Sequence, residues 1–226
     1  MSRFLVIFDL DYTLYPERQF AISGFRAAGA WAKAELGVDG LAEEMTGLLE
    51  AGMLGRIFST VLERHAPNHT PEHVKALHAA YRTAEPELEL FADGRRALDH
   101  FGRLGPLGLI TDGTLAMQAK KVKALGIAPR FAEIVYTDAL GPERAYFKPH
   151  AKPFEVMASA LGQPGDRFAY IGDNPVKDFV APNAMGWTTV QIVRDGGIHD
   201  QTRVVPGGTP QHRITTLDAL ADILGG

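Results

Sequence analysis

Two carboxylates stand two positions apart near the start of the chain, in the segment Phe8-Asp9-Leu10-Asp11-Tyr12-Thr13. A short apolar run precedes them, and in extended structure this spacing points both side chains toward the same side. Two anions at such close range need a cation nearby, or one of them must keep a proton. The pattern therefore suits acid–base or metal chemistry, although a polar turn at the end of a strand explains it as well.

Three later segments add polar groups at similar places. Thr111-Asp112-Gly113-Thr114 follows an apolar run, and Thr111 with neighbouring backbone N–H groups can hold a phosphate at the start of the next helix. Lys148-Pro149 precedes a helical pattern. The segment 172–178 has the form G-D-x(4)-D, and its carboxylates supply the hard oxygen ligands that Mg²⁺ prefers. Taken singly, each segment also has an ordinary explanation, namely a helix start, a surface lysine and a helix cap.

Short apolar runs of the kind that form buried parallel strands position these segments. They lie at residues 3–8, 106–110, 132–136, 167–171 and 187–193. Between them, three helices are predicted with these apolar faces: Leu115, Ala119 and Val122; Phe154, Met157, Ala158 and Leu161; Leu217, Leu220, Ala221 and Leu224. The alternation of strands and helices predicts an α/β fold with a doubly wound, Rossmann-like parallel sheet.

One interval breaks this alternation. Residues 16–90 hold several helical stretches and no convincing strand, and glycines and prolines punctuate them. We therefore predict a helical domain inserted after the first strand, with residues 1–15 and 91–226 forming the sheet-containing core. Such an insertion is expected over the carboxyl ends of the strands, where open α/β sheets bind ligands.

Composition excludes several classes of protein. The 226 residues are 46% hydrophobic and 22% charged, so the chain can bury a sizeable core and is not a disordered one. A net charge of −4 gives no basic footprint for nucleic acid or an anionic membrane. The absence of Cys excludes disulfides, thiolate zinc sites and a cysteine nucleophile. Because no run approaches the roughly 20 apolar residues of a membrane span, and the first apolar run is too short for a secretory signal, we expect a cytoplasmic protein.

The four polar segments, D-x-D-x-T, Thr111, Lys148-Pro149 and G-D-x(4)-D, occur in this order at inferred strand ends or loops. In this respect the chain, from residue 4 to about 193, resembles the haloacid dehalogenase-like (HAD) hydrolase superfamily, and in particular its subfamily with a helical cap after the first segment. The resemblance implies a Rossmann-like catalytic core and a mobile cap formed by residues 16–90. It also implies a Mg²⁺-dependent phosphatase that acts on a small phosphorylated metabolite.

The resemblance further implies a covalent route for the hydrolysis of a phosphate ester. Asp9 would attack phosphorus and form an aspartyl-phosphate. Asp11 would protonate the leaving oxygen and then deprotonate the attacking water. Asp11 must therefore be protonated for part of the cycle, and we expect its anionic surroundings to raise its pKa.

Two sets of binding residues follow from the same resemblance. The implied holders of Mg²⁺, which would align the phosphate with its nucleophile, are Asp9, the backbone carbonyl of Asp11, Asp173, and Asp178 through water or from beside the ligands. The implied contacts of the phosphoryl oxygens are Thr111, Asp112, Gly113 and Lys148. Thr111 and Lys148 therefore join Asp9 and Asp11 as the expected catalytic residues, and Lys148 would also keep Asp9 ionised.

Three positions depart from the family pattern. The family often has Gly or Asn where this chain has Tyr12. It commonly has Thr-Asn-Gly where this chain has Thr111-Asp112-Gly113, and an extra anion beside a phosphate is unhelpful unless Asp112 points away or meets a cation. The usual Lys-Pro-Asp-Pro is Lys148-Pro149-His150-Ala151 here, which keeps the lysine and alters the local turn.

Asp11 separates two chemistries within the superfamily. A halide leaving group needs no acid, and dehalogenases of the family lack this second Asp, so a phosphatase is favoured over a 2-haloacid dehalogenase. A phosphomutase would share every motif, whereas a non-catalytic protein on this scaffold would have lost Asp9, Asp11 or Asp173, which are intact. Among substrates, a nucleoside 5′-monophosphate competes with a sugar phosphate, because Thr13-Leu14-Tyr15 resembles pyrimidine nucleotidase-like members.

Four histidines in or near the insertion have spacings of four and five that suggest a metal cluster: His65, His69, His73 and His78. The spacing does not keep all of them on one helical face, so surface or core histidines are the favoured interpretation. The Gly/Pro-rich stretch 195–210 and the segment 194–199 are expected to be loops.

Overall fold

The computed structural model describes residues 4–53, 55–196 and 200–225. The chain divides into two compact units, one made of residues 1–16 and 89–226 and the other of residues 17–88. The first is called the sheet unit here, because the strands of the described chain belong to it. The second is called the helical unit, because its described part consists of helices and their connections.

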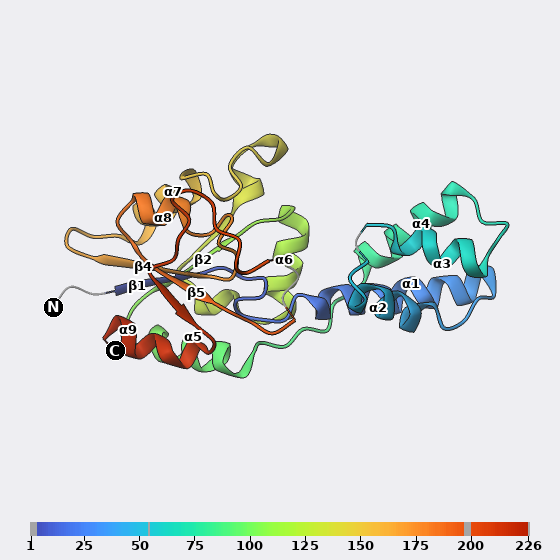
Figure 1. The fold of residues 1–226 in the computed structure, drawn as a ribbon, viewed down its shortest axis with the longest axis horizontal. Helices are drawn as coiled ribbons and strands as arrows, with labels where there is room; N and C mark the ends of the chain where they lie inside the picture. Colours follow the sequence, from blue (N-terminus) through green and yellow to red (C-terminus); the bar gives the residue numbers. More distant parts are fainter. Residues whose placement is uncertain (1–3, 54, 197–199, 226) are drawn as a thin grey trace. The chain divides into compact units, whose positions relative to one another are not determined.

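The sheet unit is built on one six-stranded sheet whose neighbouring strands are all parallel, in the order β3-β2-β1-β4-β5-β6 (Figure 1). The strands are β1 (Phe4–Phe8), β2 (Leu107–Thr111), β3 (Glu133–Tyr136), β4 (Arg167–Gly172), β5 (Thr188–Ile192) and β6 (His212–Ile214). The five predicted strands and the α/β, Rossmann-like class are confirmed. β6 was not predicted, because three residues of the sequence His-Arg-Ile are too short and too polar to signal a strand by pattern.

β1 lies where the order of the sheet reverses. Its residue Val6 pairs with Leu107 of β2 on one side and with Ala169 of β4 on the other. Since β2 and β3 extend the sheet in one direction and β4 and β5 in the other, the carboxyl ends of β1 and β4 flank the switch point at which open α/β sheets bind ligands. The pairing continues past β1, where the Asp9 N–H donates to the Ile171 carbonyl at 2.8 Å.

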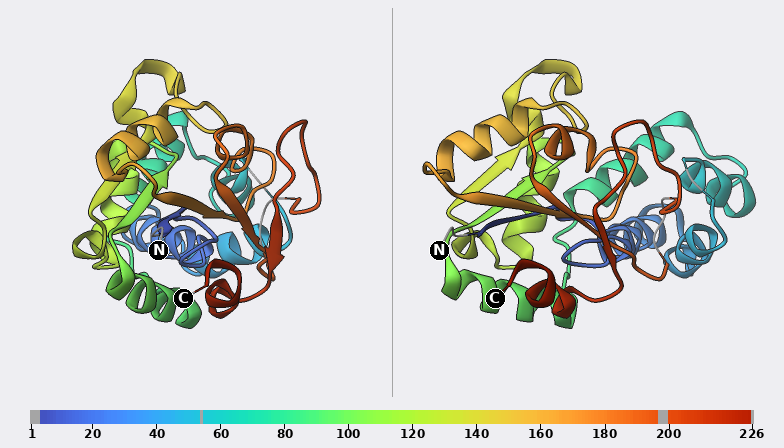
Figure 2. Two further views of the ribbon diagram at one scale, coloured as in Figure 1. Left: turned by 90° about the vertical axis from the view of Figure 1, so that its left-hand side faces the viewer. Right: turned by 60° about the vertical axis from the view of Figure 1, so that its left-hand side comes forward.

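Helices cover both faces of this sheet. α5 (Ala92–Leu104) and α9 (Leu220–Leu224) lie on one face, and α7 (Lys152–Leu161) and α8 (Val180–Ala184) lie on the other (Figures 1 and 2). The remaining helices of the unit are α6 (Leu115–Ala124) and the short 3-10 helices η1 (Ala128–Arg130), η2 (Thr137–Leu140), η3 (Pro142–Arg144) and η4 (Leu217–Ala219). One core cluster joins strands to α7 and α8: Leu5, Ile7, Ile110, Val135, Phe154, Met157, Tyr170, Phe179, Ala181 and Trp187.

The predicted apolar face of α6 is wrong in part. Leu115, which was expected on the buried face, is 43% exposed, and the buried residues of α6 are Gln118, Lys121 and Val122. The face of α7 agrees with expectation, since Phe154 and Met157 are fully buried. The last predicted helix is split into η4 and α9. The helical pattern did not indicate the buried polar side chains of α6, because burial is predicted from the spacing of apolar residues only.

The helical unit encloses a core of its own. Its helices are α1 (Arg18–Leu36), α2 (Leu41–Glu50), α3 (Ile57–His65) and α4 (Pro71–Thr83). α1 packs against α2 and α4, and α3 contacts α2 and α4. The buried core residues are Phe25, Ala28, Ala32, Leu41, Met45, Ile57, Phe58, Val61, Leu62 and Leu77. Among helices of the described ranges, in either unit, none is long and apolar enough to cross a membrane.

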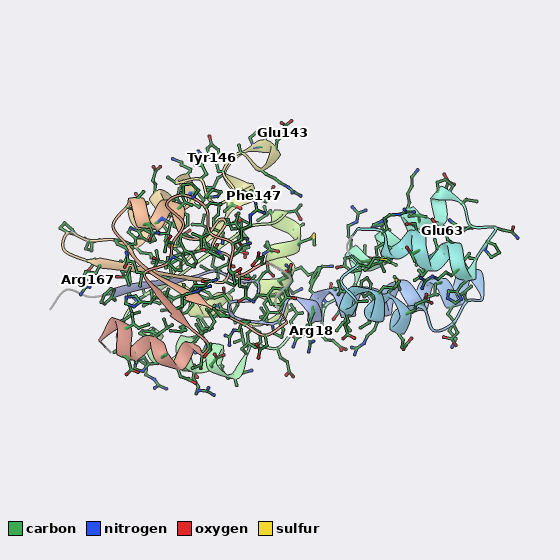
Figure 3. The ribbon with its side chains drawn as sticks, viewed as in Figure 1. Arg18, Glu63, Glu143, Tyr146, Phe147 and Arg167 are labelled. Atoms are coloured by element: carbon green, nitrogen blue, oxygen red, sulfur yellow. The ribbon has the colours of Figure 1, made fainter. Side chains whose placement is uncertain are left out.

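The connection between β3 and α7 is held by aromatic contacts just before Lys148. The guanidinium of Arg144 lies 5.5 Å from the centre of the Phe147 ring, and Tyr146 meets His150 edge-on at 5.0 Å; Tyr146 and Phe147 are labelled in Figure 3. These contacts restrain the backbone on both sides of Lys148. His150, which stands where the family pattern has Asp, therefore makes a packing contact with Tyr146.

Arg194 lies in the loop that follows β5, and its side chain tethers this loop to other parts of the sheet unit. Its guanidinium donates to both oxygens of Asp93, at 2.7 and 3.1 Å, and to the Thr13 carbonyl at 3.0 Å. It also lies 4.0 Å from the centre of the Phe91 ring. Burial acts to raise the pKa of Asp93, but hydrogen bonds from Arg194 and from backbone N–H groups outweigh it and lower that pKa. The loop prediction is confirmed for Arg194, although its side chain is anchored, while residues 197–199 lie outside the described residues.

Gly108, in β2, occupies a place with no room for a side chain. A Cβ atom there would lie 2.6 Å from Met157 Sδ and 3.0 Å from Ile7 Cγ1, both on fully buried side chains. We expect Gly108→Val to lower the free energy of unfolding by about 1–3 kcal/mol, because the packed core must be forced apart. Urea denaturation measures this change.

The matched control is Gly102→Ala in α5. The nearest atom to a Cβ at that exposed position is Leu107 Cδ1 at 3.8 Å. The control should leave stability unchanged or raise it by up to about 1 kcal/mol, because alanine favours the helix. A Gly108→Val protein as stable as the wild type would contradict the close packing of β2 against α7.

Candidate active site

Three carboxylates meet at the carboxyl ends of β1 and β4. Asp9 directly follows β1, Asp173 directly follows β4, and Asp178 lies further along the same loop. One carboxylate oxygen from each lies within 4.8 Å of the others, and the residues are only 2%, 3% and 0% exposed. Gly172 permits this approach, since a Cβ there would lie 2.6 Å from Asp178 Oδ2. The structure thus brings together residues from the first and last of the four polar segments.

The Lys148 ammonium lies among these carboxylates. It donates to Asp9 Oδ1 at 2.6 Å and to the Tyr170 hydroxyl at 2.9 Å. Asp178 Oδ1 lies 2.8 Å away, in an ion pair. The Lys148 side chain is fully buried. The cation that the D-x-D spacing required near Asp9 is therefore Lys148.

Burial and neighbouring charges perturb the titration of these groups. Burial raises the pKa of Asp9 to about 6, an effect that Lys148 opposes and Asp178 reinforces. Burial, together with repulsion from Asp178 and Asp9, raises the pKa of Asp173 well above its usual range. Burial acts to lower the pKa of Lys148, but the charges of Asp178 and Asp9 outweigh it and raise that pKa. The cluster therefore holds more negative charge than its protein surroundings compensate.

The donor set fits a divalent metal ion. When Asp9, Asp173 and Asp178 are all ionised, Lys148 balances one of their three charges, and two negative charges are left. Asp9 Oδ2 is buried and has no hydrogen-bond partner among the described residues. Carboxylate oxygens are the donors that Mg²⁺ prefers, and a bound cation would favour the ionised carboxylates. These residues can therefore hold Mg²⁺.

Asp11 contacts a different set of groups. Its Oδ1 accepts hydrogen bonds from the Tyr15 hydroxyl and the Lys121 ammonium, both at 2.7 Å. Its Oδ2 accepts a hydrogen bond from Gln118 Nε2 at 2.9 Å. The Lys121 side chain is 3% exposed and the Asp11 side chain 19% exposed. The two carboxylates of the D-x-D segment therefore have separate lysine partners.

The expectation that anionic surroundings raise the pKa of Asp11 is wrong. Burial does act in that direction, but the charge of Lys121 and the hydrogen bonds from Lys121, Tyr15 and Gln118 outweigh it, so the pKa is lowered. Sequence reasoning counted the nearby carboxylates and did not see Lys121, which is 110 positions further along the chain. Without substrate, the structure therefore favours Asp11 as a carboxylate.

Thr111, at the end of β2, is fully buried beside the partners of Asp11. Its hydroxyl oxygen accepts a hydrogen bond from Gln118 Nε2 at 2.5 Å, so its own O–H can donate to another acceptor. α6 begins shortly afterwards, as phosphate binding at a helix N-terminus requires. However, the N–H of Leu115 in its first turn already donates to Asp138 Oδ2 at 2.9 Å. One of the expected anion-binding groups is therefore engaged.

Asp112 meets a cation, as the sequence required of an extra anion at this place. Its Oδ1 accepts hydrogen bonds from the Thr137 hydroxyl at 2.9 Å and from the Lys148 N–H at 3.2 Å. Its Oδ2 lies 3.3 Å from Lys177 Nζ. Burial acts to raise the pKa of Asp112, but the charges of Lys148 and Lys177 outweigh it and lower the pKa. The Asp112 side chain is therefore engaged with protein groups.

Tyr12 adopts a backbone conformation that explains the family preference for Gly or Asn at its position. Its φ is 54°, in the left-handed region that costs most residues about 1–2 kcal/mol. Tyr12 is 3% exposed, so burial of the ring offsets this cost.

The sequence analysis missed four polar groups of this site: Gln118, Lys121, Tyr170 and Lys177. Gln118 and Lys121 are three residues apart on the helix after Thr111, a spacing that places them on one face. Lys177 stands inside the G-D-x(4)-D segment. Those positions were available signals, whereas Tyr170 looked like one more core residue of a strand.

The histidines of the helical unit do not add a second metal centre. His65 contacts Glu44, and His78 packs edge-on against Phe58. Within the part of the chain that the structure describes, the group of three or more possible metal ligands is the aspartate cluster. The surface-or-core interpretation of the histidines is the one that fits these contacts.

Known proteins resemble this chain along nearly its whole length. Residues 5–186 match the family model of haloacid dehalogenase-like hydrolases. The chain is 31% identical to a glyceraldehyde 3-phosphate phosphatase from Methanopyrus kandleri, over 97% of this chain and 96% of the relative. It is 26% identical to a ribulose-1,5-bisphosphate 5-phosphatase from Halopiger xanaduensis, over 97% of this chain and 98% of the relative.

A solved structure has the same fold. A HAD phosphatase from Thermococcus onnurineus superposes with a TM-score of 0.62 at 21% identity, over 100% of this chain and 99% of the other. The family match, the similar phosphatases and the aspartate cluster at the sheet's switch point all support the same assignment. The chain belongs to the haloacid dehalogenase-like hydrolase family, and it is a phosphoric monoester hydrolase.

Proposed function

We propose that this chain hydrolyses a small sugar phosphate through an aspartyl-phosphate on Asp9, with Mg²⁺ as its cofactor. The observation that supports this best is the state of the Asp9 carboxylate. Lys148 holds Oδ1 at 2.6 Å, while Oδ2 is buried and has no hydrogen-bond partner in the described chain. One oxygen of such a carboxylate can bond to phosphorus while the other faces a cation, and a desolvated carboxylate is a better nucleophile than a hydrated one.

The reaction proceeds in two steps. In the first, one carboxylate oxygen of Asp9 attacks phosphorus, the bond between phosphorus and the ester oxygen breaks, and the alcohol leaves with a proton from Asp11. In the second, water attacks the aspartyl-phosphate and loses a proton to Asp11. Inorganic phosphate is released, and the Asp9 carboxylate is restored.

The partners of Asp11 suit its part in this cycle. Lys121, Tyr15 and Gln118 lower its pKa, and the resulting carboxylate is the form that accepts a proton from water. The acid step needs the protonated form. A phosphate dianion bound nearby would raise the pKa of Asp11 by repulsion and so favour uptake of that proton.

Cation and phosphoryl binding complete the proposal. Asp9, Asp173 and Asp178 would hold Mg²⁺, with the backbone carbonyl of Asp11 as a further ligand, and the ion would neutralise charge on the phosphoryl group. The Thr111 hydroxyl would donate to a phosphoryl oxygen.

Sugar phosphates come before nucleotides as candidate substrates. The curated relatives described above are named for glyceraldehyde 3-phosphate and ribulose-1,5-bisphosphate. The feature that suggested a nucleotidase included Tyr15, and its hydroxyl instead donates to Asp11. Nucleoside 5′-monophosphates as substrates and the phosphomutase reaction are the alternatives that the experiment below includes. The role of residues 16–90 as a cap that sets substrate preference stays a prediction.

A panel of phosphorylated metabolites tests the substrate class. We expect kcat/KM for three- to five-carbon sugar phosphates to exceed that for nucleoside 5′-monophosphates. The opposite order would replace the proposed substrate class, and phosphoryl transfer to a second sugar position in place of release of phosphate would indicate a phosphomutase.

Asp9→Asn should abolish turnover while the fold survives. An amide cannot serve as the nucleophile, so the loss of kcat should be roughly 10⁴–10⁶-fold. The measurement is release of p-nitrophenol from p-nitrophenyl phosphate, with circular dichroism as the check on folding. Asp222→Asn, which removes an exposed carboxylate from α9, is the control and should keep wild-type rates. Near-normal activity of a contaminant-free Asp9→Asn protein would refute this assignment.

Asp11→Asn should discriminate between leaving groups. An alkyl phosphate needs a proton on its departing oxygen, and loss of the general acid should cost about 10²–10⁴-fold in kcat. p-Nitrophenolate departs without that proton, so its release should show a rapid burst followed by slow hydrolysis of the aspartyl-phosphate. Stopped-flow absorbance measures the burst. Equal losses for both substrates with no burst would remove Asp11 from the acid–base role.

Asp173→Asn should stabilise the metal-free protein and abolish its response to Mg²⁺. Because the folded state raises the pKa of Asp173, the ionised carboxylate lowers stability, and this cost grows as the pH rises through the folded pKa. The variant should therefore melt above the wild type at mildly alkaline pH, and the difference should shrink as the pH falls toward about 4, the unfolded pKa.

Added Mg²⁺ should reverse that order. At a hundredfold excess over Kd, it should stabilise the wild type by about 2.7 kcal/mol and the variant much less. Asp222→Asn again serves as the control and should respond to Mg²⁺ like the wild type. The proposed metal site fails if Mg²⁺ stabilises Asp173→Asn as much as it stabilises the wild type.

A further inference from the structure

The ammonium of Lys148 has little capacity left for a substrate. It has three N–H groups, and three oxygens already lie within 2.9 Å of it, on Asp9, Asp178 and Tyr170. A phosphoryl oxygen could reach Lys148 only by displacing one of them. Lys148 is therefore well placed to orient the nucleophile and less well placed to bind the phosphate.

The ammonium of Lys177, unlike that of Lys148, makes few polar contacts with the protein. In the described part of the chain its ammonium makes one polar contact, with Asp112 Oδ2 at the long distance of 3.3 Å. The side chain is 26% exposed, and with one polar contact the ammonium has further N–H groups to offer.

Lys177 is close enough to the carboxylate cluster to serve the same phosphoryl group. It belongs to the loop that carries Asp173 and Asp178, and its charge acts to lower the pKa of both Asp9 and Asp173. Its partner Asp112 follows Thr111, whose hydroxyl can donate to a phosphate. Lys177 therefore joins the loop of Asp173 and Asp178 to the segment that follows Thr111, and the proposed function places both around phosphorus.

We propose that Lys177 binds an oxygen of the transferred phosphoryl group and that Asp112 holds its ammonium in position. This inference rests on the proposed function and adds a catalytic residue to it. Asp112 is a positioning residue, since its oxygens are engaged by Thr137, the Lys148 N–H and Lys177.

The chemistry of the two partners explains why an Asp stands where the family pattern has Asn. An Asn side chain could still accept from Thr137 and from the Lys148 N–H, so those contacts do not require a carboxylate. A charge is required only to fix an ammonium. The anion that looked unhelpful beside a phosphate is therefore accompanied by a cation that the phosphate can share.

The first experiment compares Lys177→Met with Lys177→Arg in the Mg²⁺-loaded protein. Loss of a positioned charge that stabilises the reacting group should lower kcat/KM for p-nitrophenyl phosphate by about 10²–10³-fold in Lys177→Met. Competitive inhibition by inorganic phosphate should weaken in parallel. Lys177→Arg, which keeps a charge, should recover part of both. Lys123→Met removes an exposed lysine of α6 and should match the wild type.

The second experiment separates substrate binding from simple neutralisation of Asp112. Lys177→Met leaves Asp112 unpaired, and the double variant Asp112→Asn/Lys177→Met removes that charge as well. We expect the double variant to regain thermal stability while kcat/KM and phosphate inhibition stay impaired. If both return to wild-type values in the double variant, Lys177 only neutralises Asp112 and the inference is overturned.

The wild-type protein keeps the two proposals distinguishable. If it fails to hydrolyse p-nitrophenyl phosphate and the phosphorylated panel with Mg²⁺, the proposed function fails. If it hydrolyses them and Lys177→Met retains both kcat/KM and phosphate inhibition, only the role of Lys177 fails.

Discussion

The buried contact between the Lys148 ammonium and the carboxylates of Asp9 and Asp178 is the constraint on which the rest of the site depends. Charges removed from water are costly unless opposite charges and hydrogen bonds surround them, and removal of one partner from such a group typically costs about 3–5 kcal/mol. The parallel sheet meets this demand by ending β1 and β4 side by side. Because one ammonium cannot balance three ionised carboxylates, the same arrangement leaves an excess of negative charge, which suits a divalent cation.

The D-x-D segment shows how one short sequence yields two carboxylates of different character. Asp9 is desolvated and its pKa is raised, whereas Asp11 has a lysine, a tyrosine and a glutamine as donors and its pKa is lowered. Environments that separate the pKa values of paired carboxylates also separate their chemical roles. Here burial and the charge of Asp178 raise the pKa of Asp9 against the opposing charge of Lys148, whereas Lys121 of α6 and the neighbouring donors lower the pKa of Asp11.

Elements that bury apolar side chains can be predicted from the sequence, whereas elements that bury polar side chains are missed. Apolar runs predict the five longer strands, and positions after such runs mark the four polar segments. β6 is too short to do so, and α6 buries Gln118 and Lys121 in place of Leu115 because its inner face meets Asp11. The same limit hid the tether from Arg194 to the Thr13 carbonyl, since an arginine after a strand is more often solvated. Long-range ion pairs leave no local pattern, so the only signal of the partners that lower the pKa of Asp11 was the spacing of Gln118 and Lys121 on one helix.

Departures from a motif are best judged together with the residues that they touch. Asp112 adds a negative charge to a turn that should receive an anion, and considered alone it argues against phosphate binding. Lys177 adds one positive charge within 3.3 Å, so the pair leaves the net charge of the site as it would be with Asn at position 112 and an uncharged residue at position 177. What changes is the distribution of charge, because an ammonium now lies beside Asp112, on the loop that carries Asp173 and Asp178. A single-site comparison registers the added anion, whereas the structure shows a coupled pair in which the ammonium of Lys177 accompanies the carboxylate of Asp112.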